Sequence, residues 1–271
     1  ITARRFGARC LPALTDDALY ERTGVRVAFT GRAGGVSEGP YSSLNLGNHV
    51  GDDPASVERN RALVLEALDA ADVPLVVPSQ VHGEVVVELD DASPEALDAA
   101  REAALAGADA LVATVPGIAA LLCFADCVPV IVVSPTGRFA VAHAGWRGVE
   151  NGVAAKAVRA LARADAAELG EDAASGYNVY VGPHIHASCF ETGADVRKRF
   201  EDRFGSSCIP DERHVDLLEA LTVGLEEAGI DRARVADAGV CTVCSCDEFF
   251  SYRAAGGICG RHGAVAFRKA G

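Results

Sequence analysis

Two histidines and one cysteine, far apart in the chain, have side chains that together can bind a metal ion. They are His82 in the stretch 79–83 (SQVHG), Cys127 in 124–129 (FADCVP) and His143 in 143–148 (HAGWRG). Each stretch joins an apolar run to a glycine or proline that bends the chain. This predicts that the three side chains lie at strand ends, where loops carry function on a rigid scaffold. Two imidazoles and a thiolate are a ligand set for a catalytic zinc, with a fourth position for water or substrate.

The same three residues also permit chemistry without a metal. Cys127 can act as a nucleophile with His143 or His82 as its base, as in cysteine hydrolases. Isolated buried cysteines and histidines are also common as plain structural residues. The coincidence of all three with sharp strand-end breaks favours chemistry, but their spacing does not separate the zinc reading from the nucleophile reading, because both use the same atoms.

A second group of cysteines lies near the end of the chain. Cys241, Cys244 and Cys246, with Cys259 further on, can form a structural zinc site. Their spacing differs from that of paired CxxC knuckles, so cysteines that only pack are the alternative. The nearby pair His184 and His186 places two rings on one face of an extended segment, which suits a metal site or a loop beside a polar pocket.

The glycine-rich segment 31–39 is a candidate phosphate-binding loop. Backbone N–H groups can cradle a phosphate there, with Arg32 and Ser43 nearby. Pro40 follows the segment where a dinucleotide fold would begin a helix, so that fold is not indicated. A plain turn is the alternative.

Composition narrows the classes of partner. The chain has 271 residues and a formal net charge of −13, which argues against nucleic-acid or anionic-membrane surfaces as partners. No apolar run approaches the roughly 20 residues that span a bilayer, and the first residues lack the apolar core of a signal peptide. Nine cysteines are too few for a disulfide scaffold and are odd in number. We therefore expect a cytoplasmic protein, either a monomer or a small homo-oligomer.

Apolar runs and turn residues predict strands mixed with helices. The predicted strands are 25–29, 73–77, 85–89, 110–115, 118–124, 128–133, 139–143, 178–181, 239–246 and 264–267. The predicted helices are 56–70, 94–106, 149–164, 193–203 and 214–228. Several strand-to-strand links are too short for a helical crossover, so the sheets are partly antiparallel. The chain is therefore predicted to be one α/β (α+β) domain over residues 1–271, with sheets in the middle and helices outside.

Several stretches, in order along nearly the whole chain, resemble the YfiH family. They are 31–41 (GRAGGVSEGPY), 43–47 (SLNLG), 80–83 (QVHG), 108–111 (ADAL), 126–129 (DCVP), 143–148 (HAGWRG) and 249–253 (FFSYR). Members have been named polyphenol oxidase, laccase-domain protein and purine nucleoside phosphorylase. The chain departs from the family in the loop 184–192 and at Ala254, where a second arginine often follows Arg253.

The resemblance implies a sandwich of mixed β-sheets flanked by helices, similar in shape to cysteine hydrolases. It implies zinc bound by His82, Cys127 and His143. It also implies phosphorolysis of the purine nucleosides adenosine, inosine and methylthioadenosine, with adenosine deamination alongside and inorganic phosphate as co-substrate.

Further roles follow as hypotheses from that reaction. Arg32 would neutralise phosphate, and Asp126 would orient a metal ligand or assist proton transfer beside the catalytic pair Cys127 and His143. Ser43, Asn45 and Arg147 are assigned to substrate binding. A copper-dependent polyphenol oxidase remains an alternative because His and thiolate also suit copper, although a multi-copper laccase needs more than the seven histidines present. A metal-free cysteine hydrolase using Cys127 and His143 is the other alternative.

Overall fold

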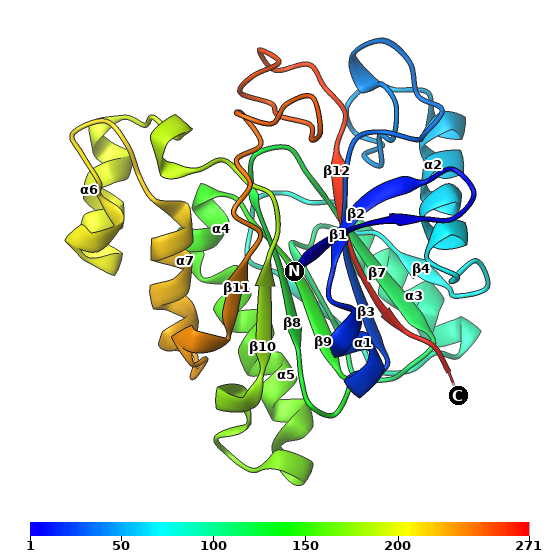
Figure 1. Cartoon of the computed structure of the whole chain (residues 1–271). Helices are drawn as coiled ribbons and strands as arrows, with labels where there is room; N and C mark the ends of the chain where they lie inside the picture. The colour runs from blue at the N-terminus through cyan, green and yellow to red at the C-terminus, as the bar shows by residue number, and fades with distance from the viewer. Residues whose placement is uncertain (271) are drawn as a thin grey trace.

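Two mixed β-sheets lie face to face in the computed structural model, which describes residues 1–270 (Figure 1). Gly271, the last residue of the predicted domain, lies outside the described residues. The first sheet has six strands in the order β1-β2-β3-β12-β7-β4. Their bounds are β1 Thr2–Phe6, β2 Leu11–Thr15, β3 Val25–Thr30, β4 Leu75–Val76, β7 Ile118–Phe124 and β12 His262–Arg268. Only the β4–β7 pair in this sheet is parallel.

The second sheet also has six strands, in the order β11-β10-β8-β9-β6-β5. Their bounds are β5 Val86–Leu89, β6 Ala110–Ala113, β8 Val128–Val133, β9 Phe139–Ala144, β10 Asn178–Val181 and β11 Val235–Asp237. The hairpin β8–β9 and the β6–β9 pair are antiparallel, whereas the outer pairs β5–β6 and β10–β11 are parallel. The predicted mixture of sheet directions is confirmed.

Strand β8 shows why these apolar runs form strands buried on both faces. Its side chains alternate, because successive residues of a strand point to opposite faces. Val128, Val130 and Val132 pack under the helices that cover the second sheet. Ile131 and Val133 point between the two sheets. A strand covered on both faces needs no polar positions, which explains the continuous apolar sequence.

Helices cover the outer faces of the sheets, except for 17–23 and 94–105, whose buried side chains join the core between the sheets. Their bounds are α1 Asp17–Thr23, α2 Pro54–Ala67, α3 Pro94–Leu105, α4 Trp146–Asn151, α5 Val153–Leu169, α6 Ala194–Phe204 and α7 Leu217–Glu226. Residues of α5, α6 and α7 share the core under the second sheet, and α2 packs on the outer face of the first. Figure 1 shows these two groups of helices on opposite sides of the sheets.

Most predicted elements are confirmed, with shifts of a few residues at their ends. The predicted helix 149–164 is instead two helices, α4 and α5, because Gly152 adopts a left-handed conformation with φ 74° between them. The predicted strand 239–246 is wrong. Only Cys241 makes an isolated bridge, to His184, and residues 242–248 form turns. Strands β1, β2 and β11 and helix α1 had no counterpart in the predicted elements.

The ends of three strands and one loop bring the candidate residues to the same end of the sheets. Cys127 lies in the short link from β7 in the first sheet to β8 in the second, and His143 is the penultimate residue of β9. His82 lies in the loop between β4 and β5. Among residues 1–270, no helix is both long and apolar enough to cross a bilayer. Cytoplasmic location stays a prediction.

Candidate metal centre and active site

Asp109 fixes the loop that carries His82. This carboxylate is fully buried just before β6 and accepts hydrogen bonds from the backbone N–H groups of three consecutive residues. The bonds come from Val81 at 3.2 Å, His82 at 3.1 Å and Gly83 at 2.7 Å. They hold His82 in a left-handed conformation, with φ 58°, that non-glycine residues rarely adopt. The position of the His82 imidazole therefore depends on the hydrogen bonds of the Asp109 carboxylate to this loop.

The same carboxylate orients His143. Its Oδ1 lies 2.7 Å from Nδ1 of His143, and the backbone N–H of His143 donates to the carbonyl of Asp109, also at 2.7 Å. A carboxylate bonded to one ring nitrogen leaves the other nitrogen free as a ligand, which is the usual arrangement behind a metal-binding histidine. Asp109 thus organises both imidazoles. Sequence reasoning did not assign it a role, although its stretch 108–111 belongs to the family-like set.

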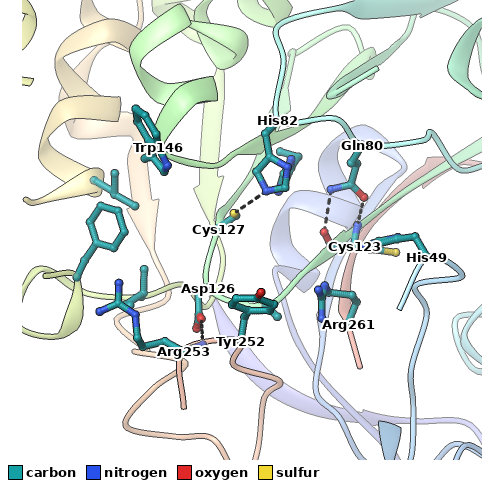
Figure 2. Close-up of a pocket in the computed structure, with 15 residues that line it drawn as sticks. His49, Gln80, His82, Cys123, Asp126, Cys127, Trp146, Tyr252, Arg253 and Arg261 are labelled. Atoms are coloured by element: carbon teal, nitrogen blue, oxygen red, sulfur yellow. Dashed lines mark hydrogen bonds between the residues drawn. The ribbon is translucent and has the colours of Figure 1, made fainter. Parts of the chain in front are cut away.

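Cys127 completes the group on the link between the two sheets. The ligand atoms of His82, Cys127 and His143 all lie within 4.8 Å of one another. Cys127 Sγ is 3.8 Å from His82 Nε2, and Figure 2 draws this contact as a dashed line. Gly145 permits this approach, because a Cβ there would lie 2.9 Å from His82 Cδ2 and 3.1 Å from Cys127 Sγ. The predicted convergence of the three residues is therefore present in the structure.

The donor set fits a tetrahedral zinc ion. Ligand distances of about 2.3 Å to sulfur and 2.0–2.1 Å to nitrogen imply a sulfur–nitrogen separation of about 3.6 Å at the tetrahedral angle. The 3.8 Å between Cys127 Sγ and His82 Nε2 is close to that value. Three protein ligands leave a fourth position for water or substrate, as in catalytic zinc sites. The ligand types and their proximity therefore suit a metal held by His82, Cys127 and His143.

Cys127 and His143 are strongly coupled electrostatically. Burial raises the pKa of a thiol, but the charge of His143 and hydrogen bonds with both histidines outweigh it and lower the pKa of Cys127 to about 6. Burial lowers the pKa of an imidazole, yet the Cys127 thiolate and the Asp109 carboxylate raise the pKa of His143 to about 9. Both shifts favour a thiolate and an imidazolium in the metal-free pair, and a bound metal ion would take the place of the imidazolium proton.

These residues line a cavity of about 420 Å³. The size is that of a site for a small organic molecule. Its apolar wall is made by Trp146, Ile185, Phe190, Leu217 and Tyr252. Its polar lining includes His49, Gln80, Arg253 and Arg261. In Figure 2, Trp146 and Arg253 lie to one side of Cys127, and His49, Gln80 and Arg261 lie to the other.

Gln80 and Asp126 anchor opposite walls of this cavity. The Gln80 amide makes two 2.8 Å bonds to the backbone of Cys123 in β7, shown in Figure 2. The Asp126 carboxylate accepts hydrogen bonds from Thr242 Oγ1, Ser251 Oγ and the backbone N–H of Arg253, all at 2.7 Å. These bonds tie the C-terminal loop to the strand link. Asp126 lines the cavity, but its hydrogen bonds are made to the loop, and its role in orienting a metal ligand or in proton transfer stays a prediction.

The glycine-rich segment does not contribute its predicted residues to the cavity lining. Arg32 donates to the backbone carbonyls of Ser42 and Cys246. Ser43 Oγ accepts from the N–H of Gly35. Asn45 is fully buried and bonds Gly47, Asp52 and the backbone N–H of Arg261. Arg32, Ser43 and Asn45 are thus engaged in hydrogen bonds within the chain, and their roles in binding phosphate and substrate stay predictions.

Arg147, His184 and His186 also lie outside the cavity lining. Arg147 is exposed, with its guanidinium carbon 4.4 Å from the centre of the Trp146 ring. His184 Nδ1 bonds the carbonyl of Gly182, and its ring lies 4.9 Å from that of His186. Sequence reasoning missed Arg261 and His49, whose positions depend on contacts between distant segments, and it gave no role to Arg253.

The fold and the site define a mixed α/β protein with a His/Cys/His metal-type centre in a small-molecule cavity. A family model described as multi-copper polyphenol oxidoreductase laccase matches residues 26–269, and the chain belongs to this family. Two solved structures share the fold. YfiH of Bacillus licheniformis has a TM-score of 0.82 at 27% identity, covering 95% of this chain and 96% of that one. YlmD of Geobacillus stearothermophilus has a TM-score of 0.80 at 30% identity, covering 98% and 100%. The predicted YfiH resemblance and fold class are confirmed.

Curated relatives carry names of purine enzymes. A protein named purine nucleoside phosphorylase from Pseudomonas aeruginosa is 35% identical over 237 residues, covering 84% of this chain and 88% of the relative. A protein named adenosine deaminase from an unknown prokaryotic organism is 34% identical over 255 residues, covering 91% and 95%.

Proposed function

We propose that this chain is a zinc-dependent purine nucleoside phosphorylase acting on adenosine, inosine and methylthioadenosine, with accompanying adenosine deamination. One observation carries the proposal. The His/Cys/His group, two arginines and an aromatic wall line the same cavity of about 420 Å³. Phosphorolysis needs sites for an anion, a sugar and a planar base, and these features supply suitable chemistry. The names of the relatives support the same reaction class.

Arg261 is the proposed phosphate ligand. It lines the cavity in a chain whose net charge is −13, so it provides a local positive charge in an acidic protein. Its Nη1 is held by the carbonyls of Cys259 and Gly260. Of the five N–H donors of a guanidinium, those on Nε and Nη2 can therefore face an anion. Partial burial and the charge of Arg261 lower the pKa of the adjacent His49, which favours a neutral imidazole beside the phosphate.

The opposite side of the cavity suits the purine. Trp146 and Phe190 provide aromatic faces there on which a base can stack, and Ile185 and Leu217 complete the apolar wall. Tyr252 lies beside Arg261, whose guanidinium carbon is 5.7 Å from the centre of the tyrosine ring. Trp146 is the first residue of α4, and Leu217 is the first residue of α7. The base would thus be held by rigid elements, which restricts its orientation relative to Cys127 and Arg261.

In phosphorolysis a phosphate oxygen forms a bond to C1′ of the ribose while the bond from C1′ to the purine nitrogen breaks. The purine leaves with the bonding electron pair and takes up a proton. Arg261 would neutralise charge on the attacking phosphate, and the aromatic wall would position the base and exclude water. When bound to His82, Cys127 and His143, zinc would supply a Lewis acid for a phosphate or ribose oxygen. Asp126 would act by holding Arg253 and the loop in place.

The test is release of hypoxanthine from inosine by protein with measured metal content. We expect release to require phosphate, to yield ribose 1-phosphate in equal amount, and to disappear in Cys127→Ala and His143→Ala. Cys10→Ala is the matched control, because Cys10 is an exposed thiol outside the cavity lining. Adenosine is tested in parallel, with and without phosphate, to separate deamination from phosphorolysis. Absence of both reactions in zinc-loaded wild-type protein would refute the proposal.

The geometry also favours a second candidate, a metal-free cysteine hydrolase. Such enzymes use a carboxylate that orients a base, which in turn activates a thiolate. The side chains of Asp109, His143 and Cys127 have this arrangement in space. Chelation separates the two functions. A phosphorylase that needs zinc loses activity in chelator and regains it with zinc, whereas a thiol hydrolase keeps its activity in chelator and loses it on alkylation. Copper is measured in the same samples, since the family description names it.

A further inference from the structure

A second group of thiols lies at the rim of the cavity, apart from His82, Cys127 and His143. The ligand sulfurs of Cys189, Cys241 and Cys244 all lie within 4.8 Å of one another. Cys189 Sγ and Cys244 Sγ are 3.7 Å apart. The sequence pattern had suggested Cys241, Cys244, Cys246 and Cys259 as a set. The structure instead brings Cys189, from a segment more than fifty residues earlier, to Cys241 and Cys244.

Backbone N–H groups surround the sulfur of Cys241, which precedes a run of turns. Residues 242–248 are turns, and the backbone N–H of His186 donates to Cys241 Sγ at 3.4 Å. Burial raises the pKa of this thiol, but hydrogen bonds from the backbone N–H groups of His186, Cys244 and Val243 outweigh it and lower the pKa. Several N–H donors directed at one sulfur stabilise a thiolate, which is the form that binds a metal.

The three cysteines connect two segments that form one wall of the cavity. Cys189 ends the short helix η3 (Ala187–Cys189), next to the cavity-lining Phe190. Cys241 and Cys244 belong to the loop that leads to Arg253. Arg253 donates to the carbonyls of Cys189 and Glu191, at 3.1 and 3.2 Å. A bond network already joins the two segments at this point, and a shared ion would add a second connection.

We propose that Cys189, Cys241 and Cys244 form a second metal site, for a thiophilic divalent cation such as Zn²⁺, which clamps the segment at Phe190 to the loop at Arg253. Three cysteines from two segments, deprotonated when they bind the ion, match the ligand type and the role of structural zinc sites. Cys244 is exposed, so an ion can enter and a water molecule can complete the coordination. A disulfide would use only two of the three sulfurs and would need them about 2.05 Å apart. The site does not depend on the reaction proposed for the cavity.

Cobalt binding tests the site independently of activity. The experiment uses Cys127→Ala, which removes one ligand of the first centre, titrated with Co²⁺ under reducing conditions. We expect about one equivalent of cobalt with thiolate-to-metal charge-transfer absorption, and a rise in the unfolding temperature. Adding Cys189→Ser or Cys244→Ser should abolish both signals. Adding Cys246→Ser is the matched control, because Cys246 is an exposed thiol of the same loop outside the group, and it should leave them unchanged.

Two results would overturn the proposal. The first is a cobalt titration that contradicts the site: either Cys127→Ala shows no charge-transfer absorption and no rise in unfolding temperature, or adding Cys244→Ser leaves both signals unchanged. The other is purified protein lacking bound metal, with a Cys189–Cys244 disulfide shown by a mass two hydrogens lower, which would make the pair a redox element. Far-ultraviolet circular dichroism of each metal-free variant checks folding. His82→Ala replaces Cys127→Ala as the background if the latter does not fold.

Discussion

Replacement of Asp109 by asparagine should damage metal binding more than a loss of charge alone suggests. The carboxylate accepts four hydrogen bonds, two on each oxygen. Asparagine keeps the shape but offers only one acceptor oxygen, so its NH2 group faces two donors. If the NH2 group faces His143, the ring must present Nδ1 as an acceptor and carry its proton on Nε2, the atom needed by a metal. If it faces Val81 and Gly83, the loop that carries His82 is loosened.

The size of the effect follows from these contacts. Loss of the partner that orients a metal-binding histidine lowers metal affinity by roughly 10- to 100-fold. The substitution loses two hydrogen bonds to a buried carboxylate, each worth about 1.5–3 kcal/mol. The unfolding free energy of the metal-free protein should therefore fall by at most about 3–6 kcal/mol. The assay is a competition titration with a chromophoric zinc chelator, together with denaturant unfolding of the chelated protein.

Asp165→Asn is the matched control. Asp165 is also fully buried and accepts from Tyr177, Thr136 and Arg138, but Thr136 lies in the turn between β8 and β9, at the opposite end of these strands from Cys127 and His143. It should lower stability and leave zinc affinity unchanged. If Asp109→Asn binds zinc as tightly as the wild-type protein, the argument that Asp109 organises both imidazoles is refuted.

Three further predictions follow from single contacts. Gly145→Ala should reduce zinc affinity about 10-fold or more, because the added Cβ would press on His82 and Cys127. Gly176→Ala is the control, because a Cβ there would have its nearest neighbour at 3.8 Å, and zinc affinity should not change. Equal zinc affinities of the two variants in the titration would contradict this prediction. Arg261→Gln should raise the KM for phosphate about 10-fold or more without changing zinc content, and Arg32→Gln should leave that KM unchanged. If initial-rate assays show the larger increase in KM for Arg32→Gln, the phosphate-binding role predicted for Arg32 from the sequence is favoured instead. His262 is fully buried, and burial lowers its pKa to about 3, so the unfolded chain binds a proton below pH 6.5 that the folded chain does not. The contribution of neutral His262 to stability is therefore complete above pH 6.5 and is lost at up to about 1.4 kcal/mol per pH unit as the pH falls toward 3. In denaturant unfolding, the unfolding free energy of His262→Leu should fall less steeply with decreasing pH than that of the wild-type protein. An equal slope would show that His262 does not cause the loss of stability in acid.

The sequence predicted the parts of the fold that depend on local pattern. The apolar runs of β7, β8 and β9 are continuous because these strands are covered on both faces, so their bounds could be placed closely. The segment 239–246 also looked like a strand. Its conformation is instead set by distant contacts, namely those of Asp126 with Thr242 and Ser251, which no local pattern encodes.

The candidate site shows the same division. His82, Cys127 and His143 could be predicted because metal-binding side chains beside strand-end glycines or prolines are visible in sequence. The contacts of Arg32 could not be predicted. Its guanidinium donates to the carbonyls of Ser42 and of Cys246, and Cys246 lies more than two hundred residues away in the chain. Asp109 was missed for the converse reason. A single buried carboxylate gains its importance only from the loop and the ring that converge on it.

The central claim is that a metal held by His82, Cys127 and His143 is required for phosphorolysis. The most direct test is the rate of ribose 1-phosphate formation from inosine as zinc is added back to chelated protein. The Cys244→Ser variant is used, so that the second proposed site does not take up the ion. We expect no activity without zinc and a linear rise that saturates at about one equivalent. Full activity of the chelated protein, or none at any zinc level, would contradict it.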